Sequence, residues 1–305
     1  MALYNVKFEL LSPISTIPNS QTIFGTICTY YASMYGDKDL ENILKDVNTT
    51  NYPFIVSSMF FKDTIPLPLT FNPEYQELTE KRTKLLKSTK KIKYLSKDIF
   101  LKCEKNIEKL NSVILDFLEN EIFIIKNDIL MTKEDSCNHD FIMVKNERTR
   151  VYIEDKQYYN NYLTYFSKGM IFDFYMDIPD ITMYGKIEKL LKKMNYITFG
   201  GGKSVGYNMF SFKSIKLEKD LKSPSPNLLL SLAIGDKTIN YDESFYKINI
   251  INNKFNVPGE AVNRKKIVCF SEGSCIKTSS KVIGGLVKEE NNGNITYQNF
   301  LGLLI

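Results

Sequence analysis

The sequence predicts an α+β fold, and three observations carry that prediction. The chain opens on an alternating strand, Leu3–Leu10, which is followed by a helix with one apolar face. A second amphipathic helix, Tyr184–Met194, leads through a glycine-rich loop into another strand, Met209–Leu217. Beyond the Ser-Pro-Ser-Pro stretch at residues 223–226 come only short strand-like runs with glycine-containing turns. We therefore expect one mixed domain followed by a smaller, less regular one.

The first helix begins after Pro18, where Asn19 or Ser20 is suited to cap it, and it ends at Gly36. Backbone N–H groups at a helix N-terminus attract anions, so this end is a candidate phosphate site. A simple cap is the commoner role of such residues.

A basic segment follows a proline-punctuated stretch, Asn48–Phe71, which we expect to form short extended pieces at a core edge. Residues 81–109 contain 11 Lys or Arg and 3 Asp or Glu, a local charge of +8 in a chain of +5. This concentration indicates either an anionic partner or a solvated helical face. Lys90, Lys91 and Lys93 are the candidate interface residues.

The middle of the chain supplies the remaining strands of the first domain. Tyr162–Phe166 and Met170–Met176 are predicted to form a hairpin through Ser167–Gly169. The resulting order is strand, helix, long insertion, strand, strand, helix, strand, which is the βαββαβ order of a ferredoxin-like (RRM-like) fold. We expect this domain to span residues 1–220, with the insertion at about 48–145, and the second domain to span 221–305.

The loop Phe199–Phe210 is the strongest candidate binding element. Four glycines let backbone N–H groups approach a phosphate closely, and Lys203 and Ser204 add a positive charge and a donor. A helix stop is the alternative, although one glycine would serve for that. The glycines are Gly200, Gly201, Gly202 and Gly206.

Two familiar phosphate motifs are excluded for this loop. Ile197 and Val205 stand where a P-loop and a dinucleotide fingerprint need glycine, and both motifs run from a strand into a helix. Tyr207 beside the loop is placed to stack on a base, although core packing is the commoner fate of such residues.

Little in the sequence supports catalysis or a cofactor. His139, the one histidine, lies in a polar, loop-like stretch, so we expect a surface side chain rather than a Cys137–His139 or Asp–His dyad. Asp173, Asp177 and Asp180 cluster near the glycine loop without enough partners for a metal. Five cysteines without a Cys-x-x-Cys pair indicate reduced thiols in a cytoplasm, and no apolar run is long enough to span a membrane.

Motifs spread along most of the chain also carry a family resemblance in their order and spacing. They are Ser20–Ile27, Pro53–Phe60 with Ile65–Pro68, Lys90–Ser96, Arg148–Arg150, Gly200–Phe210, and Phe270–Ser274 with Gly284–Gly285. Together they resemble the RAMP superfamily of CRISPR-associated proteins, and within it the family of subunit four of the type III-A Csm interference complex.

That resemblance implies a pair of ferredoxin-like domains, the second smaller and degenerate, in a non-catalytic scaffold. It implies binding to the 5′ handle of the guide RNA, and contacts with the large polymerase-like signalling subunit and the first backbone subunit. Target RNA would be met only indirectly. Gln21 stands where the family commonly has Asp. The residues assigned to RNA are Asn19, Ser20, Gln21, Arg148, Arg150, Gly200, Gly201, Gly202, Lys203, Ser204, Gly206, Tyr207, Gly273 and Ser274.

Two alternatives stay open. One is a RAMP endoribonuclease that processes precursor guide RNA with His139 as acid or base, although the first helix and the glycine loop lack a histidine. The other is the equivalent subunit of a related type III-B or type I complex. The Lys90–Ser96 and Phe270–Ser274 motifs argue against it.

Overall fold

An antiparallel sheet forms the centre of the molecule in the computed structural model. The structure describes residues 2–75, 79–152, 157–201, 203–221, 227–251, 254–257, 260–263, 265–291 and 294–305. The strand order is β11-β12-β1-β10-β2, and β3 also pairs with β10. The strands are β1 (Leu3–Leu10), β2 (Ile55–Val56), β3 (Phe60–Phe61), β10 (Ile171–Asp177), β11 (Ile197–Thr198) and β12 (Met209–Leu217).

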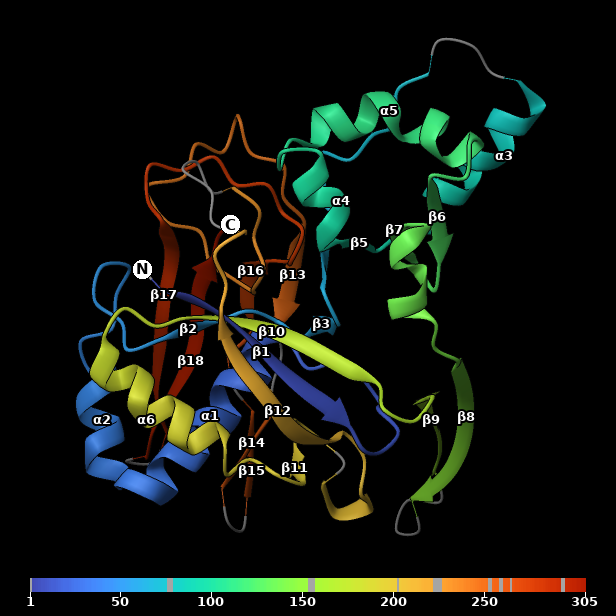
Figure 1. Cartoon of the computed structure of the whole chain (residues 1–305). Coiled ribbons are helices and arrows are strands. Elements are labelled where there is room, and N and C mark those ends of the chain that lie inside the picture. The colour runs from blue at the N-terminus through green and yellow to red at the C-terminus, as the bar shows by residue number, and fades with distance from the viewer. Residues whose placement is uncertain are drawn as a thin grey trace.

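Three helices, α1 (Ser20–Tyr35), α2 (Asp37–Leu44) and α6 (Ile181–Leu191), lie on one side of this sheet (Figure 1). The alternation of β1 directs Val6 and Phe8 into the core that α1 and α6 cover, where both side chains are fully buried. Burying side chains of this size contributes about 1.5–3 kcal/mol each, so the apolar periodicity fixes which sheet face the helices cover.

Residues 3–217 contain the predicted βαββαβ order, but the insertion follows the second strand instead of preceding it, and the predicted hairpin is wrong. Tyr162–Phe166 lies within β9 (Gln157–Phe166), which pairs with β8 (Met143–Tyr152), whereas β10 pairs with β1, β2 and β3. The second strand of the order is therefore the interrupted β2–β3 edge. The prediction of short extended pieces at a core edge is confirmed for these residues.

The insertion after β3 forms a sheet of its own, with the order β4-β5-β7-β6. Helices α3 and α5 stand at the upper right of Figure 1, away from α1, α2 and α6. The elements are β4 (Thr64–Pro66), α3 (Glu80–Thr89), β5 (Tyr94–Ser96), α4 (Lys97–Lys102), α5 (Ile107–Glu119), β6 (Phe123–Lys126) and β7 (Ile129–Thr132), followed by a 3₁₀ turn at Glu134–His139.

The C-terminal part consists of strand pairs, and its described residues contain no helix. A shared core joins it to the insertion and to the second face of the main sheet, through Leu301, Leu95 and Tyr175 among others. The α+β class is confirmed, whereas the boundary at 220/221 stays a prediction. The strand pairs are β13 (Ile248–Ile251) with β16 (Ile267–Phe270), β14 (Lys254–Val257) with β15 (Glu260–Asn263), and β17 (Val282–Asn291) with β18 (Asn294–Leu303).

Within the described ranges, no helix combines the length and the apolar character needed to cross a lipid bilayer.

Candidate nucleic-acid interface

The glycine loop connects β11 to β12 and is largely exposed. It contains a 3₁₀ turn at Lys203–Val205, and Gly200 and Gly206 have positive φ angles of 83° and 73°. These angles explain glycine at both positions, because other L-residues are strained there. A Cβ on Gly201 would meet no atom within 4 Å. Gly202 lies outside the described residues, as does the side chain of Lys203.

Asn208 fastens this loop to the segment before α1. Its Oδ1 accepts from the backbone N of Ser15 at 2.9 Å, while its Nδ2 donates to the carbonyl of Gly201 at 2.9 Å and to Ser15 Oγ at 3.2 Å. Asn208 is buried and has a φ of 54°, a conformation that Asn tolerates better than most residues. The sequence analysis missed this residue, although an Asn that follows a glycine-rich turn is a signal for it.

The loop lies beside the first turn of α1, as the two predicted phosphate sites would require. A Cβ built on Gly200 would stand 3.2 Å from Cγ2 of Thr22. Asn19 is the N-cap of the helix and accepts from the backbone N of Thr22 at 3.0 Å. The structure therefore brings Asn19 and the glycine loop together.

Ser20 and Gln21 face inward, toward the C-terminal part of the chain. The backbone N of Ser20 donates to Ser58 Oγ at 2.9 Å, and Ser20 Oγ accepts from the backbone N of Leu232 at 3.0 Å. The Gln21 amide donates to the carbonyl of Asn299 and accepts from its backbone N. An amide suits this paired role better than an acid, because an ionised carboxylate cannot donate. That explains glutamine here.

Gly273 and Ser274 form a buried turn rather than an open surface. Gly273 has a φ of 85°, and a Cβ there would come within 2.7 Å of the Leu67 carbonyl oxygen. Ser274 Oγ donates to the carbonyl of Ser271 at 2.7 Å. The neighbouring Glu272 accepts from Ser58, and burial raises the pKa of Glu272 while that hydrogen bond acts in the opposite direction. The turn therefore connects the insertion, α1 and the C-terminal part.

Most basic side chains of residues 81–109 are exposed, and most of these charges meet acids of the insertion. Arg82 pairs with Asp116 at 2.5 Å and with Glu119 at 3.1 Å, and Lys93 pairs with Asp128 at 2.8 Å. Lys90 and Lys91 are exposed, and neither forms an ion pair with any described residue. The net field is therefore weaker than the local charge of +8 alone indicates.

A hollow of about 170 Å³ lies between the basic segment and the stretch that precedes α1. It is lined by Ile14–Ile17, which Asn208 fastens to the loop, and by Lys93 and Lys145. Lys145 belongs to β8, the strand that also carries Arg148 and Arg150. The side chains of these two arginines lie outside the described residues. The base of the hairpin is joined to the main core, because Thr164 of β9 bridges Ile14 and the ring of Phe166 packs against Phe61 and Phe172.

Tyr207 is 9% exposed, so its ring is not accessible for stacking on a base in this structure. Tyr196, which the sequence analysis passed over, is 75% exposed and precedes β11. An isolated aromatic residue after the Lys192–Lys193 pair and Asn195 was the available signal.

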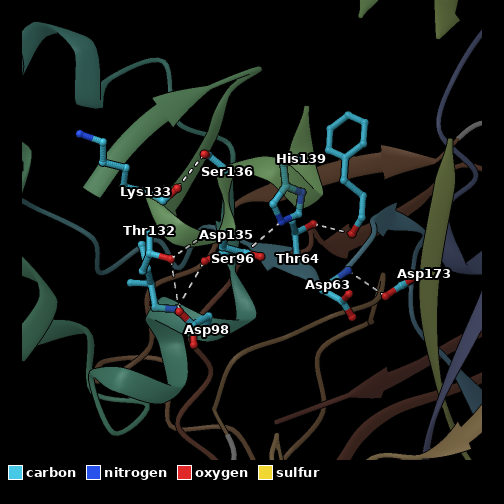
Figure 2. Close-up of polar contacts among 12 residues, drawn as sticks. Asp63, Thr64, Ser96, Asp98, Thr132, Lys133, Asp135, Ser136, His139 and Asp173 are labelled. Atoms are coloured by element: carbon cyan, nitrogen blue, oxygen red, sulfur yellow. Dashed lines mark hydrogen bonds and ion pairs between the residues drawn. The ribbon is translucent and has the colours of Figure 1, made fainter. Parts of the chain in front are cut away.

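His139 is not on the surface, contrary to expectation. It is 1% exposed, and its Nε2 lies 3.2 Å from Asp135 Oδ2 within the 3₁₀ turn (Figure 2). Burial lowers the pKa of His139, and Asp135 acts in the opposite direction. The packing of the turn against β7 and β6 buried a residue whose sequence neighbours are polar. The described residues contain no group of His, Cys, Asp and Glu that could hold a metal ion.

Asp173 is a buried carboxylate on β10. It accepts from the backbone N of Asp63 at 2.8 Å and from Asn5 at 3.2 Å, and Lys7 lies 3.6 Å away (Figure 2 shows the Asp63 contact). Burial raises the pKa of Asp173 to about 6, and Lys7 offsets part of that shift.

We expect this shift to appear in the pH dependence of stability. The folded-state pKa of Asp173 lies above the unfolded value of 3.8. The stability contributed by the protonated carboxyl is therefore present at low pH and is lost as pH rises through about 6. The free energy of unfolding of Asp173→Asn minus that of the unsubstituted protein should therefore be larger at about pH 7.5 than at about pH 4, by roughly 2–3 kcal/mol. Urea unfolding at both pH values measures it. A constant difference would show that the pKa of Asp173 is the same in the folded and the unfolded protein.

Comparisons with solved structures show which proteins share this fold. The chain is similar to a chain of the Csm3-Csm4 subcomplex in the type III-A CRISPR-Cas interference complex, with 18% identity, a TM-score of 0.64, and coverage of 100% of this chain and 98% of that one. It is also similar to a chain of the Csm1-Csm4 cassette in complex with pppApA, with 18% identity, a TM-score of 0.62, and coverage of 100% of this chain and 97% of that one. A chain of the same cassette in complex with cA4 has 19% identity and a TM-score of 0.60, with coverage of 99% of this chain and 97% of that one. No protein-family model and no curated protein matches the chain.

The fold is thus that of a subunit found in type III-A interference complexes. Csm4 is the component that these structures have in common, and the resemblance to subunit four is confirmed at the level of the fold.

Proposed function

We propose that the protein is a non-catalytic structural subunit of a type III-A CRISPR effector complex, with two ferredoxin-like units of which the second is degenerate. In this proposal it binds the 5′ handle of the guide RNA and links a Csm1-like large subunit to a Csm3-like backbone subunit. One observation supports RNA binding most directly. The exposed glycine loop is fastened by Asn208 to a segment that lines a hollow with Lys93 and Lys145. Lys93 also pairs with Asp128 in this hollow, whereas Lys145 is exposed. Backbone donors and lysines suit phosphates and carry no base preference.

A second surface supports protein partners. Ile248, Ile250 and Val268 are neighbours on one face of the β13–β16 pair and are 57–61% exposed. Contiguous exposed apolar side chains of this kind mark surfaces that a protein partner covers. Three exposed lysines lie at the ends of these two strands, Lys247, Lys265 and Lys266. We therefore assign this face to a protein subunit whose apolar contact area is flanked by acidic residues.

Gly201→Val provides the test of the RNA site. Because Gly201 has open space around it and a φ outside the positive region, the variant should fold normally. The added side chain would hold phosphates away from the loop, and we expect about tenfold weaker binding of single-stranded RNA carrying the handle. Lys203→Ala should lower the slope of log affinity against log salt by about 1. Filter binding with the full chain at several salt concentrations measures both.

Gly185→Val is the matched control, because Gly185 is exposed on α6 with no atom within 4 Å of a built Cβ. Equal RNA binding by folded Gly201→Val and Gly185→Val proteins would remove the loop from the RNA site. The RNA should also remain intact during the assay. Cleavage that disappears in His139→Ala would favour the endoribonuclease instead, a role that the burial of His139 argues against.

A further inference from the structure

The second face of the main sheet is open at its β11–β12 end. Ile197 of β11 is paired with Phe210 of β12, and both side chains are buried in the core. Side chains alternate along a strand, so the neighbouring Thr198, Met209 and Ser211 line the other face of the sheet. Neither Met209 nor Ser211 is buried, and Lys213 and Leu11 are exposed beside them. The C-terminal core that covers Tyr175 and Leu3 does not include these residues.

Tyr196 stands at the edge of this open face in an unfavourable backbone conformation. Its φ is 57°, and a bulky side chain in this left-handed region costs roughly 1–2 kcal/mol. The conformation is fixed by its neighbours. The backbone N of Phe212 donates to the carbonyl of Met194 at 3.1 Å, and Ser211 Oγ donates to Asn195 Oδ1 at 3.1 Å. Strain of this kind is maintained where the position of a side chain matters.

The ring of Tyr196 has no partner among the residues that the structure describes. It is 75% exposed, and among the described residues it makes no side-chain hydrogen bond and no ring contact. A glycine or asparagine would satisfy the backbone at lower cost. The ring is therefore not explained by packing.

The surroundings of Tyr196 fit single-stranded nucleic acid. Lys193 lies three positions before Tyr196, and Lys213 follows Phe212, whose backbone N bonds the Met194 carbonyl. Both lysines are exposed, and Lys213 also pairs with Glu9. Leu11, 40% exposed, continues the apolar surface. Single-stranded RNA is held by aromatic rings under its bases and by lysines along its backbone. Gly200 is four positions after Tyr196, about 13 Å along an extended chain at 3.3 Å per residue.

We propose that Tyr196 is a stacking platform for one base of the RNA whose phosphates the glycine loop holds. The proposal rests on the proposed function, because it places a base next to the phosphate site assigned there. Stacking on a phenol ring accepts any base, so this subsite contributes affinity and the path of the strand rather than sequence preference.

The chain's lack of tryptophan allows a direct readout. In the full-length Tyr196→Trp protein, the single indole reports on its own surroundings. Titration with an oligoadenylate of about ten nucleotides should quench its fluorescence, and the same oligomer made of abasic units should not. Phe245→Trp is the control, since Phe245 is 59% exposed and precedes β13, which is well separated from β11 in Figure 1. Its fluorescence should not change.

Replacing Tyr196 by glycine should lower the affinity for RNA without lowering the stability of the fold. Tyr196→Ala should weaken oligoadenylate binding by roughly 5- to 100-fold, while Tyr196→Phe should bind as the unsubstituted protein does. Tyr196→Gly should lose the same affinity yet melt at an equal or higher temperature, because it relieves the left-handed strain. A merely structural tyrosine would instead lower the melting temperature when replaced by glycine.

The outcomes separate the two proposals. If the unsubstituted protein binds oligoadenylate, and Tyr196→Ala binds it equally well, the stacking platform is wrong and the proposed function stands. If the unsubstituted protein binds no RNA, handle sequence included, both are wrong. Equal quenching by abasic and adenylate oligomers would place the strand near Tyr196 without stacking, which also overturns the inference.

Discussion

Gly284→Ala is expected to produce one of the two largest losses of stability among the changes considered. Gly284 in β17 has a φ of 82°, and a Cβ there would overlap the carbonyl oxygen of Phe300 and approach that of Ile234 to 3.0 Å. Both obstacles are backbone atoms, and that of Phe300 belongs to the paired strand β18, so neither can move aside as a flexible side chain does. We expect a loss of about 3 kcal/mol or more in the free energy of unfolding, measured in urea.

Gly285→Ala is the adjacent control for that prediction. It has no positive φ, and no atom lies within 4 Å of a built Cβ. Its stability should stay within about 0.5 kcal/mol of the unsubstituted protein. Similar losses for the two variants would show that β17 tolerates no side chain in general, and that the close approach at Gly284 is not the cause.

Asn208→Ala is expected to destabilise the protein by about 3 kcal/mol and to weaken RNA binding. The change removes three hydrogen bonds of a buried side chain and leaves the Ser15 N–H and the Gly201 carbonyl without their partner. It also places alanine at a φ of 54°. Urea unfolding and RNA filter binding on the same samples measure the two effects.

Asn208→Gly separates the two causes, because glycine keeps the backbone conformation and loses only the side-chain bonds. We expect it to be about 1 kcal/mol more stable than Asn208→Ala and equally weak in RNA binding. Full RNA affinity in a folded Asn208→Gly protein would mean that the loop needs no fastening in order to bind.

The elements with clear periodicity were predictable from the sequence. β1 and β12 have the predicted bounds, and α1 starts at the predicted cap and ends at Gly36. Such elements bury a continuous apolar face, so the pattern alone identifies them. The second strand was missed because β2 and β3 are two residues long and surrounded by prolines, which is too short for alternation to show.

The candidate site was only partly predictable, for a different reason. The glycine loop and Asn19 are local features, and the structure places them together. Gln21 and Ser20 are polar residues whose partners lie far along the chain, so no local pattern distinguishes a buried hydrogen-bonding role from an exposed one. Tyr196 depends on a backbone angle, which propensity does not reveal.

The bond between Gln21 and Asn299 also bears on how the chain folds. The two residues are 278 positions apart, and Ser20 and Leu232 are 212 apart. At a synthesis rate of about 5–20 residues per second, the first helix would wait roughly 15–55 s for the strand that satisfies its amide. Contacts of such separation slow folding and leave polar and apolar groups of α1 exposed in the nascent chain. We therefore expect production of the protein to depend on chaperones that bind the growing chain.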